Sequence, residues 1–72
     1  MNEFISTPES SNLAGFSYEK TTRTLTVKFN HGGVYDYFSV PDSIFEGMKK
    51  ADSKGRYFDA IVKKGGYKYK KK

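Results

Sequence analysis

The most regular alternation of apolar and polar positions runs through residues 24–29, TLTVKF. Its apolar side chains occupy every second position: Leu25, Val27 and Phe29. Strict period-two alternation indicates a strand with one buried and one solvated face. Weaker alternation over residues 12–18 predicts a strand before it, and VYDYFS, residues 34–39, predicts one after it. The segments EKTTR and NHGG form the connecting turns.

Two amphipathic helices are predicted after the strands. Pro41 suits the first turn of the first helix, because its missing N–H would have no partner there. Apolar residues then recur at helical spacing: Ile44, Phe45, Met48 and Ala51. Gly47 costs roughly 1 kcal/mol relative to alanine inside a helix, which indicates close packing at that position.

The second helix begins at Asp52 or Ser53, because either side chain can cap a helix. Its apolar side is formed by Tyr57, Phe58, Ile61 and Val62. Lys63 and Lys64 occupy the last turn, and Gly65-Gly66 ends the helix.

Together these elements predict an α+β domain in which a three-stranded antiparallel β-meander is covered on one face by two helices, in the order β-β-β-α-α. Residues 1–11 are expected to form a flexible lead-in, because they are mostly polar and contain Pro8. Residues 12–67 form the domain, and residues 68–72 form a basic tail. The segment YKYKKK either adds a short edge strand or stays flexible.

The orientation of Tyr35 and Tyr37 depends on the length of the loop before them. A three-residue loop, residues 31–33, places Phe29 opposite Tyr35 and Val27 opposite Tyr37, so that both tyrosines face the helices. A loop of two or four residues instead turns the alternate side chains inward: Val34, Asp36 and Phe38.

The inward orientation of the tyrosines is favoured, because the alternative buries the carboxylate of Asp36 without an obvious partner. A tyrosine ring can be buried while its hydroxyl reaches water or a partner. Val34 and Phe38 then remain on the outer face. This face lacks the aromatic platform on which sheet-type RNA-binding domains stack bases.

Composition limits the core and narrows the functions. The 72 residues make one domain, which buries only about 60% of the surface that its unfolded chain exposes. No cysteine is present, which fits a reducing compartment and excludes disulfides and thiolate metal sites. The sequence shows no apolar run long enough to span a bilayer and no secretory signal. We therefore expect a cytoplasmic monomer without membrane association.

Charge is distributed unevenly along the chain. The net charge is +5, but residues 1–48 carry a net −3 and residues 49–72 a net +8. The last ten residues contain six lysines and no acidic residue. Such asymmetry indicates a polyanionic partner or, alternatively, a solvated tail that keeps a small protein in solution.

Catalytic and metal chemistry are not indicated. His31 is the one histidine, and it lies in a glycine-rich loop without a cysteine to pair with. No convergent set of metal-ligand spacings is present. We predict no catalytic residue, no metal site and no cofactor, and therefore no enzyme.

The strongest functional candidate is the segment SKGRYFDAIVKKGGYKYKKK. Lysines attract phosphates and aromatic rings stack on unpaired bases, so their interleaving suits single-stranded nucleic acid. The candidate nucleic-acid-binding residues are Lys54, Arg56, Lys63, Lys64, Tyr67, Lys68, Tyr69 and Lys70. The competing interpretation packs Tyr57 and Tyr67 in the core and assigns Lys63 and Lys64 to the helix dipole.

A longer set of residues stands in a characteristic order and spacing between residues 12 and 67. It comprises Gly15, Tyr18, Leu25, Val27, Phe29, Tyr35, Tyr37, Val40, Pro41, Ala51, Ser53, Gly55, Phe58 and Ile61. This order resembles the KTSC domain, a module at the C-terminus of some lysyl-tRNA synthetases that also occurs as small free-standing bacterial and phage proteins.

Because the family's module is found on some lysyl-tRNA synthetases, RNA binding has been suggested for it. The resemblance implies the same function here, by association alone. We interpret the matching motif residues as mainly structural: Tyr35, Tyr37, Pro41, Ser53, Gly55 and Phe58. Two functions therefore remain. The first is a non-enzymatic module that binds RNA or single-stranded nucleic acid weakly through the basic C-terminal third. The alternative is a protein–protein interaction adaptor that uses Val34 and Phe38 on the outer sheet face.

Overall fold

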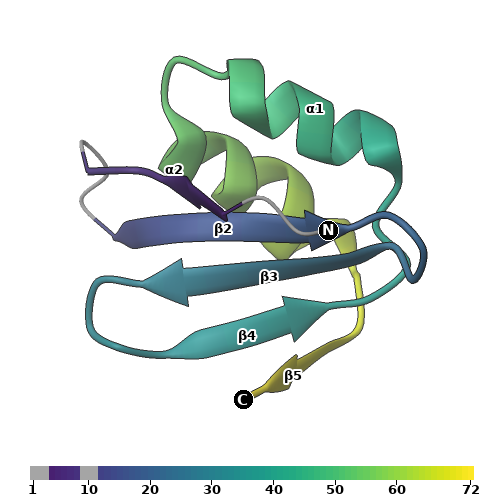
Figure 1. The fold of residues 1–72 in the computed structure, drawn as a ribbon. Helices are drawn as coiled ribbons and strands as arrows, with labels where there is room; N and C mark the ends of the chain where they lie inside the picture. Colours follow the sequence, from purple (N-terminus) through teal and green to yellow (C-terminus); the bar gives the residue numbers. More distant parts are fainter. Residues whose placement is uncertain (1–3, 9–11) are drawn as a thin grey trace.

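The computed structural model describes residues 4–8 and 12–72 and contains a single antiparallel sheet with one helical layer. Five strands lie in the sheet in the same order as in the chain (Figure 1). They are β1 (Phe4–Ser6), β2 (Leu13–Glu19), β3 (Thr24–Phe29), β4 (Val34–Tyr37) and β5 (Tyr69–Lys71).

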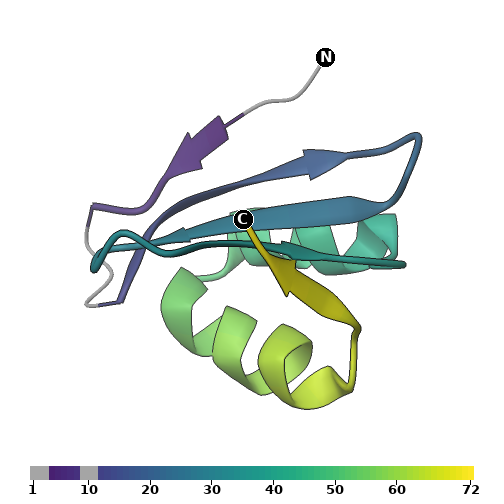
Figure 2. The same cartoon turned by 90° about the horizontal axis from the view of Figure 1, so that it is seen from below.

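The helices lie between β4 and β5 in the sequence and cover one side of the sheet, as the turned view in Figure 2 shows. Helix α1 spans Asp42–Lys50. Helix α2 (Lys54–Tyr57) continues directly into a π-helical turn, η1 (Phe58–Val62), and a 3₁₀ turn, η2 (Lys63–Gly65). Within residues 4–8 and 12–72, no helix lies on the outer face of the sheet (Figure 2).

The prediction of a three-stranded meander is wrong, although the α+β class is correct. Strand β1 pairs with β2, and β5 pairs with β4, which makes five strands. Both added strands have only three residues, too few to show a reliable alternation. The edge-strand alternative for YKYKKK is therefore the correct one. The flexible lead-in predicted for residues 1–11 lies partly outside the described residues, and its described part contains β1.

The loop between β3 and β4 directs the tyrosines toward the helices. Leu25 pairs with Tyr37 and Val27 with Tyr35. The Phe29 N–H donates to the Gly33 carbonyl at 2.8 Å, which closes a three-residue loop over residues 30–32. The loop has the predicted length but begins one residue earlier. Because this displaces the pairing by two residues, the side-chain parity is unchanged and both tyrosines face inward.

The core lies between the inner face of the sheet and the helices. Its fully buried side chains are Phe16, Phe58, Leu13, Leu25, Met48, Val27, Val40 and Val62. Each side chain of this size contributes about 1.5–3 kcal/mol on complete burial. The Tyr18 hydroxyl donates to the Val40 carbonyl and ties β2 to the segment that leads into α1. Burial, reinforced by the Asp42 carboxylate, raises the pKa of Tyr18 above its usual value.

The second helix shows one confirmed detail and one correction. Ser53 is its N-cap, and the Ser53 hydroxyl accepts from the Arg56 N–H at 3.4 Å. Ile61, predicted on the apolar side, is 39% exposed. The π-helical turn explains the error, because its wider i→i+5 turn buries Phe58 and Val62 and rotates the intervening Ile61 outward.

Close packing at Gly47 agrees with its predicted role. A Cβ atom there would lie 2.2 Å from the hydroxyl oxygen of Tyr57. The absent side chain therefore lets the Tyr57 ring approach α1. Ala51, predicted in the apolar stripe of this helix, instead follows α1 with an extended backbone.

Candidate nucleic-acid interface

Strand β5 brings the C-terminal lysines and Tyr69 beside the central tyrosines. Tyr69 pairs with Tyr37, and Lys71 pairs with Tyr35. Since side chains alternate along a strand, Tyr69 and Lys71 lie on the helix-covered side of the sheet, and Lys70 lies on the outer side. Pairing of β4 and β5 thus joins two sequence motifs that are about thirty residues apart.

The inner side of this sheet edge contains a groove of about 420 Å³, which we call the edge groove. Its lining residues come from β3, the following loop, β4, η2 and β5: Phe29, His31, Tyr35, Tyr37, Lys63 and Tyr69. Five of these six side chains are aromatic. Aromatic and aliphatic linings with few polar groups are typical of small-molecule sites.

The rings of the edge groove contact one another in a continuous series. The ring centroids of Tyr37 and Tyr69 are 5.3 Å apart, and those of Tyr35 and Tyr69 are 6.0 Å apart. The rings of Phe29 and His31 are stacked at 5.5 Å with an interplanar angle of 13°. Phe29 also meets Tyr35 edge-on at 5.5 Å. These contacts hold the rings in defined orientations.

Exposure increases along this series from the core to the solvent. Tyr37 is 6% exposed, Tyr35 is half-buried and Tyr69 is 61% exposed. Burial raises the pKa of the Tyr37 hydroxyl above its ordinary value, with smaller contributions from Tyr69 and Tyr35. Tyr37 is therefore uncharged at neutral pH and belongs to the core. Tyr69 presents most of its ring to solvent.

Lys63 borders the edge groove from the helical side. Lys63 belongs to η2, and its Nζ atom lies 3.8 Å from the Asp59 carboxylate. Both side chains are largely exposed, and such pairs contribute little to stability. Lys63 can therefore exchange this carboxylate for another anion at small cost.

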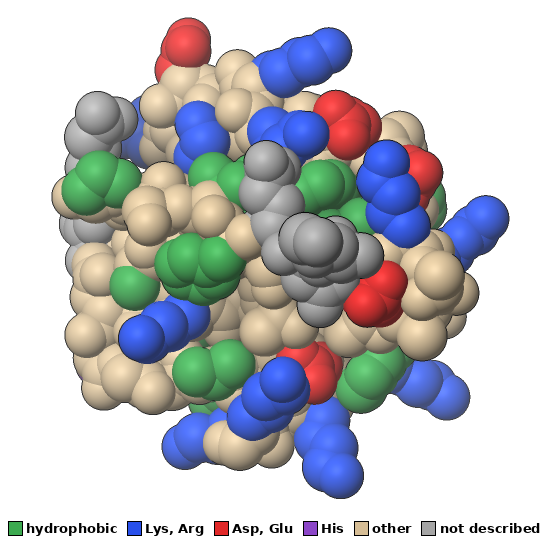
Figure 3. Space-filling model, viewed as in Figure 1, with side chains coloured by type: hydrophobic (Ala, Val, Ile, Leu, Met, Phe, Trp, Pro, Cys, Tyr) green, Lys and Arg blue, Asp and Glu red, His purple; other side chains and the backbone are tan. Residues whose placement is uncertain are grey.

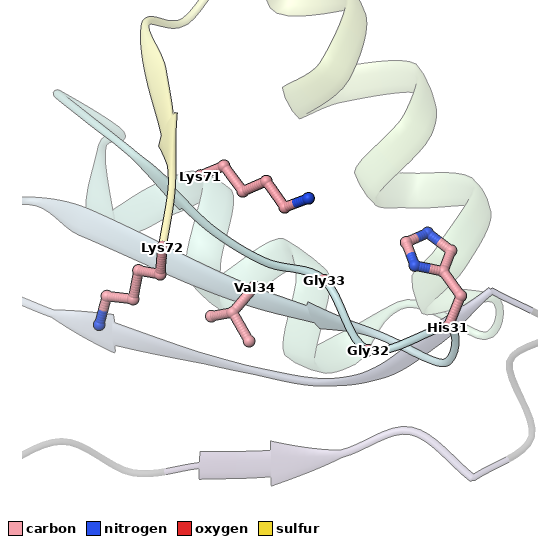
Figure 4. A pocket seen from close by; sticks show the side chains of 6 residues that line it. All are labelled: His31, Gly32, Gly33, Val34, Lys71 and Lys72. Atoms are coloured by element: carbon pink, nitrogen blue, oxygen red, sulfur yellow. The ribbon is translucent and has the colours of Figure 1, made fainter.

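A second hollow of about 430 Å³ lies next to the edge groove, between the β3–β4 loop and the end of β5 (Figure 4). Its lining residues are His31, Gly32, Gly33, Val34, Lys71 and Lys72. Figure 4 shows Lys71 and His31 extending to one side of the sheet, and Val34 and Lys72 to the other. His31 borders both hollows.

On the outer face, Asp36 lies beside Lys70 of β5 and beside Lys72, which follows β5. Its carboxylate accepts a hydrogen bond from the Thr26 hydroxyl at 2.6 Å and lies 3.8 Å from the Nζ atom of Lys72. Lys70 pairs with Asp36 across the strands. Figure 3 shows the resulting concentration of basic side chains along the lower edge, where β5 lies in Figure 1.

The structure brings together only part of the predicted basic set. Lys54 donates to the Ala51 carbonyl at 3.1 Å, and Arg56 is exposed near the start of α2. Lys54 and Lys63 are nine residues apart, roughly 13 Å along a helix axis. Lys54 and Arg56 therefore lie at the opposite end of the helix from the edge groove.

The remaining predicted residues divide between exposed and packed positions. Lys64 and Lys68 are exposed. Tyr67 is half-buried against the core, and its ring lies so close to Gly65 that a Cβ atom there would be 2.9 Å away. The Lys68 carbonyl accepts from the Phe38 N–H at 2.9 Å. The placement of Tyr67 agrees with the competing, structural interpretation of this residue.

The motif residues outside the groove occupy helix starts and the core. Pro41 precedes α1 with φ −66°, and Ser53 caps α2. Gly55 is buried, and Phe58 is 1% exposed and meets the Tyr37 ring edge-on. Tyr37 shares this packing role at 6% exposure, whereas Tyr35 is half-buried; both rings also line the edge groove.

Sequence reasoning missed Phe29 and His31 at the edge groove, and Lys71 and Lys72 at the adjacent hollow. A lone loop histidine has no catalytic partner, so the sequence by itself does not indicate His31. The available signal was the alternation in YKYKKK, which matches YDY in antiparallel pairing. Without knowledge of that pairing, nothing in the sequence connects His31 with the C-terminal segment.

Neither a metal centre nor a membrane span is found in residues 4–8 and 12–72. Over this part of the chain, no three potential ligands among His, Cys, Asp and Glu come together. None of its helices has the length and hydropathy needed to cross a bilayer.

Comparison with known proteins defines the family. The family model of the KTSC domain matches residues 9–69. The chain belongs to the KTSC domain family. A crystal structure of a KTSC domain protein from Yersinia pestis has the same fold, with a TM-score of 0.89 and 29% identity, and the match covers 100% of this chain and 99% of that one. The sequence resemblance is thereby confirmed.

Relatives of this KTSC domain include both large enzymes and small proteins. Lysine–tRNA ligase from Nostoc punctiforme is 47% identical over 62 residues, and the match covers 86% of this chain but 11% of the ligase. A ligase from Trichormus variabilis gives the same identity and coverage. An uncharacterized protein from Stutzerimonas stutzeri is 34% identical over 61 residues, with 85% and 86% coverage. The chain thus spans about a ninth of the ligases it matches.

Proposed function

We propose that this KTSC domain is a non-enzymatic, monomeric module of the cytoplasm that binds RNA or other single-stranded nucleic acid through the β5 edge. The observation that carries the proposal is the pairing of β5 with β4, which gathers lysines around an aromatic groove. A positively charged track beside exposed rings is the common arrangement in proteins that bind single strands.

The electrostatics of the β5 edge support a polyanionic ligand. Residues 63–72 contain six lysines and no acidic residue. Two of these lysines have carboxylate partners, Asp59 and Asp36, each at 3.8 Å with the lysine exposed. The Lys63–Asp59 pair is exposed on both sides and is worth about 0–1 kcal/mol, so a phosphate can displace Asp59 readily. Asp36, whose side chain is 19% exposed, is the less exposed of the two carboxylates.

The relatives support RNA in particular. The ligases from Nostoc punctiforme and Trichormus variabilis are named for a reaction on tRNA, and each carries a segment 47% identical to this chain. The segment is about a ninth of each ligase. A role in holding RNA is compatible with such a small appended module.

The adaptor alternative rests on exposed apolar residues of the outer face. Of the predicted pair, Val34 is half-buried and Phe38 is 37% exposed, and Phe4 adds a third apolar side chain that is 55% exposed. Phe4 lies on β1 and Phe38 just after β4, and the polar pair of Thr26 and Asp36 lies between them. A divided apolar surface favours a protein partner less than the β5 edge favours nucleic acid.

The proposed function is tested by an NMR titration of the isotope-labelled chain with single-stranded RNA, single-stranded DNA and tRNA. We expect amide shifts concentrated at β5 and η2, weakening with salt but persisting at physiological salt. Shifts that vanish with modest salt, or never occur, would refute the proposal. Shifts confined to Lys54 and Arg56 would move the site to the start of α2.

A pull-down under native conditions tests the adaptor alternative independently of nucleic-acid binding. Wild-type chain and Phe38→Glu serve as matched baits, because Phe38 is exposed and its side chain belongs to no core contact. Recovery of one defined protein by wild type alone supports the adaptor function. Equal recovery by both baits excludes the outer face around Phe38.

A further inference from the structure

The geometry points to a more specific ligand for the edge groove: one unpaired nucleobase of a single strand, stacked against Tyr69 and Tyr35, with its backbone phosphates on Lys63 and Lys71. This inference rests on the proposed function and deepens it. It distinguishes the position that binds a base from the lysines that attract the nucleic-acid backbone.

The size and lining of the groove fit a small aromatic ligand. Its volume of about 420 Å³ lies in the range of about 300–1,000 Å³ found for small-molecule sites. The five rings that line it belong to Phe29, His31, Tyr35, Tyr37 and Tyr69. A site for phosphate alone requires no such wall of rings, whereas a base offers a flat π surface to match them.

Tyr69 is the part of this wall that is free to stack on a ligand. It is 61% exposed, although its ring lies 5.3 Å and 6.0 Å from the rings of Tyr37 and Tyr35. Its backbone is fixed by pairing with Tyr37. The ring is therefore oriented before a ligand arrives, and this lowers the entropy lost on binding.

Charge complementarity identifies the ligand as part of a polyanion. Lys63 approaches the groove from η2, and Lys71 projects from β5 on the same side of the sheet as His31 (Figure 4). Over the described residues, no Asp or Glu lines the edge groove or the adjacent hollow. A base with a phosphate on either side satisfies both the rings and the lysines.

Polar groups at the groove can recognise a base edge. The hydroxyls of Tyr35 and Tyr69 can donate and accept, and the imidazole of His31 provides ring nitrogens. A base inside a duplex is stacked on its neighbours and cannot enter such a groove without being extruded. The groove is therefore suited to unpaired nucleotides rather than to a duplex.

The test compares a short oligouridylate RNA with an abasic sugar-phosphate strand of the same length, at the same salt concentration. Tyr69→Ala should weaken binding of the RNA about 10-fold, whereas Tyr69→Phe, which keeps the ring, should retain it. Neither variant should change binding of the abasic strand. His31→Ala, on the loop and independent of β5 pairing, should also weaken RNA binding alone.

A second measurement locates the base directly. Titration with uridine 5′-monophosphate should shift the ring-proton resonances of Tyr69, Tyr35 and His31 upfield, as expected for a stacked base. Hydrogen exchange of the Phe38 amide, whose N–H donates to Lys68, shows whether β5 remains paired in Tyr69→Ala. If that variant loses β5, the His31→Ala comparison decides the question.

The outcomes distinguish the two proposals. Equal binding of RNA and abasic strand, unaffected by Tyr69→Ala and His31→Ala, would overturn the base site and leave phosphate binding in place. Failure of the wild type to bind either strand would overturn both proposals. Loss of RNA binding in the alanine variants, with the abasic strand unaffected, supports the base site.

Discussion

The two edges of the sheet are alike in backbone and different in surroundings. Strands β1 and β5 have three residues each, and each carries a strongly exposed aromatic side chain, Phe4 at 55% and Tyr69 at 61%. Phe4 lies on the outer face against Gly15. Tyr69 lies on the inner face, within a series of rings and beside lysines.

The comparison shows that exposure of an aromatic residue does not by itself indicate a site. Phe4 fills the space above a glycine, which is a packing contact between two strands. Tyr69 is similarly exposed, but it also has a hydroxyl, neighbouring aromatic rings and positive charge close by. These neighbours, rather than the exposed area, make the β5 edge suited to a polyanion with aromatic bases.

The largest expected effect concerns the packing at the β1 edge. A Cβ atom at Gly15 would lie 2.3 Å from the Phe4 ring and 2.7 Å from the Ile5 carbonyl oxygen. Gly15→Ala should therefore lower the free energy of unfolding by about 2 kcal/mol, measured by urea denaturation. Combining it with Phe4→Ala should recover only part of the loss, because the backbone oxygen remains. Complete recovery would show that the ring alone causes the conflict.

Neutralising the β5 edge should give the next largest effect. Lys70→Gln with Lys71→Gln should weaken binding of single-stranded RNA about 25-fold near 0.1 M salt and reduce the log–log salt slope by about 1.4. Fluorescence anisotropy across a salt series measures both quantities. The matched control is Lys20→Gln with Lys50→Gln, which removes two exposed charges away from the groove. Equal losses in both variants would mean that only net charge matters.

Removing each exposed ring tests the comparison directly. Tyr69→Ala should weaken RNA binding about 10-fold, whereas Phe4→Ala should leave it unchanged, because Phe4 lies at the opposite edge of the sheet and on its other face. Affinities from the same anisotropy assay provide the check. A comparable loss in Phe4→Ala would place the ligand on the outer face instead.

The smallest effect concerns alkaline stability. Burial raises the pKa of Tyr37 above its ordinary value, so the folded state keeps this proton at pH values where the unfolded state, near pKa ~10, has lost it. The contribution of the Tyr37 hydroxyl to the free energy of unfolding is fully present below about pH 10. It is lost as the pH rises through the folded-state pKa. Tyr37→Phe should flatten the decline in stability in this range, as followed by thermal unfolding. A profile parallel to wild type would contradict the assignment.

The sequence predicts those elements whose side chains alone specify them. Strict alternation at Leu25 and Val27 identifies β3, and helical spacing with Pro41 identifies α1. Strands β1 and β5 are held by backbone pairing at the sheet edges, and three residues carry no usable period. Ile61 was misplaced because a π turn changes the helical period locally.

The candidate site was only partly predictable. The alternation of side chains along β4 predicts the direction of Tyr35 and Tyr37. The alternation of tyrosines and lysines near the C-terminus indicates Tyr69 and Lys70. The interpretation of Tyr35 as mainly structural does not anticipate that β5 widens the sheet and leaves a groove at this edge, where Tyr35 is half-buried. His31 and Lys71 depend on that same long-range pairing, so local sequence could not assign them.

The groove depends on the least anchored strand of its neighbourhood. All three residues of β5 are exposed, and none belongs to the buried core. Elements with few buried contacts open at a small fraction of the global unfolding free energy. Transient detachment of β5 would abolish the groove while the core beneath Tyr37 stays folded. A bound strand would oppose that opening, so amide protection in β5 should rise with ligand concentration.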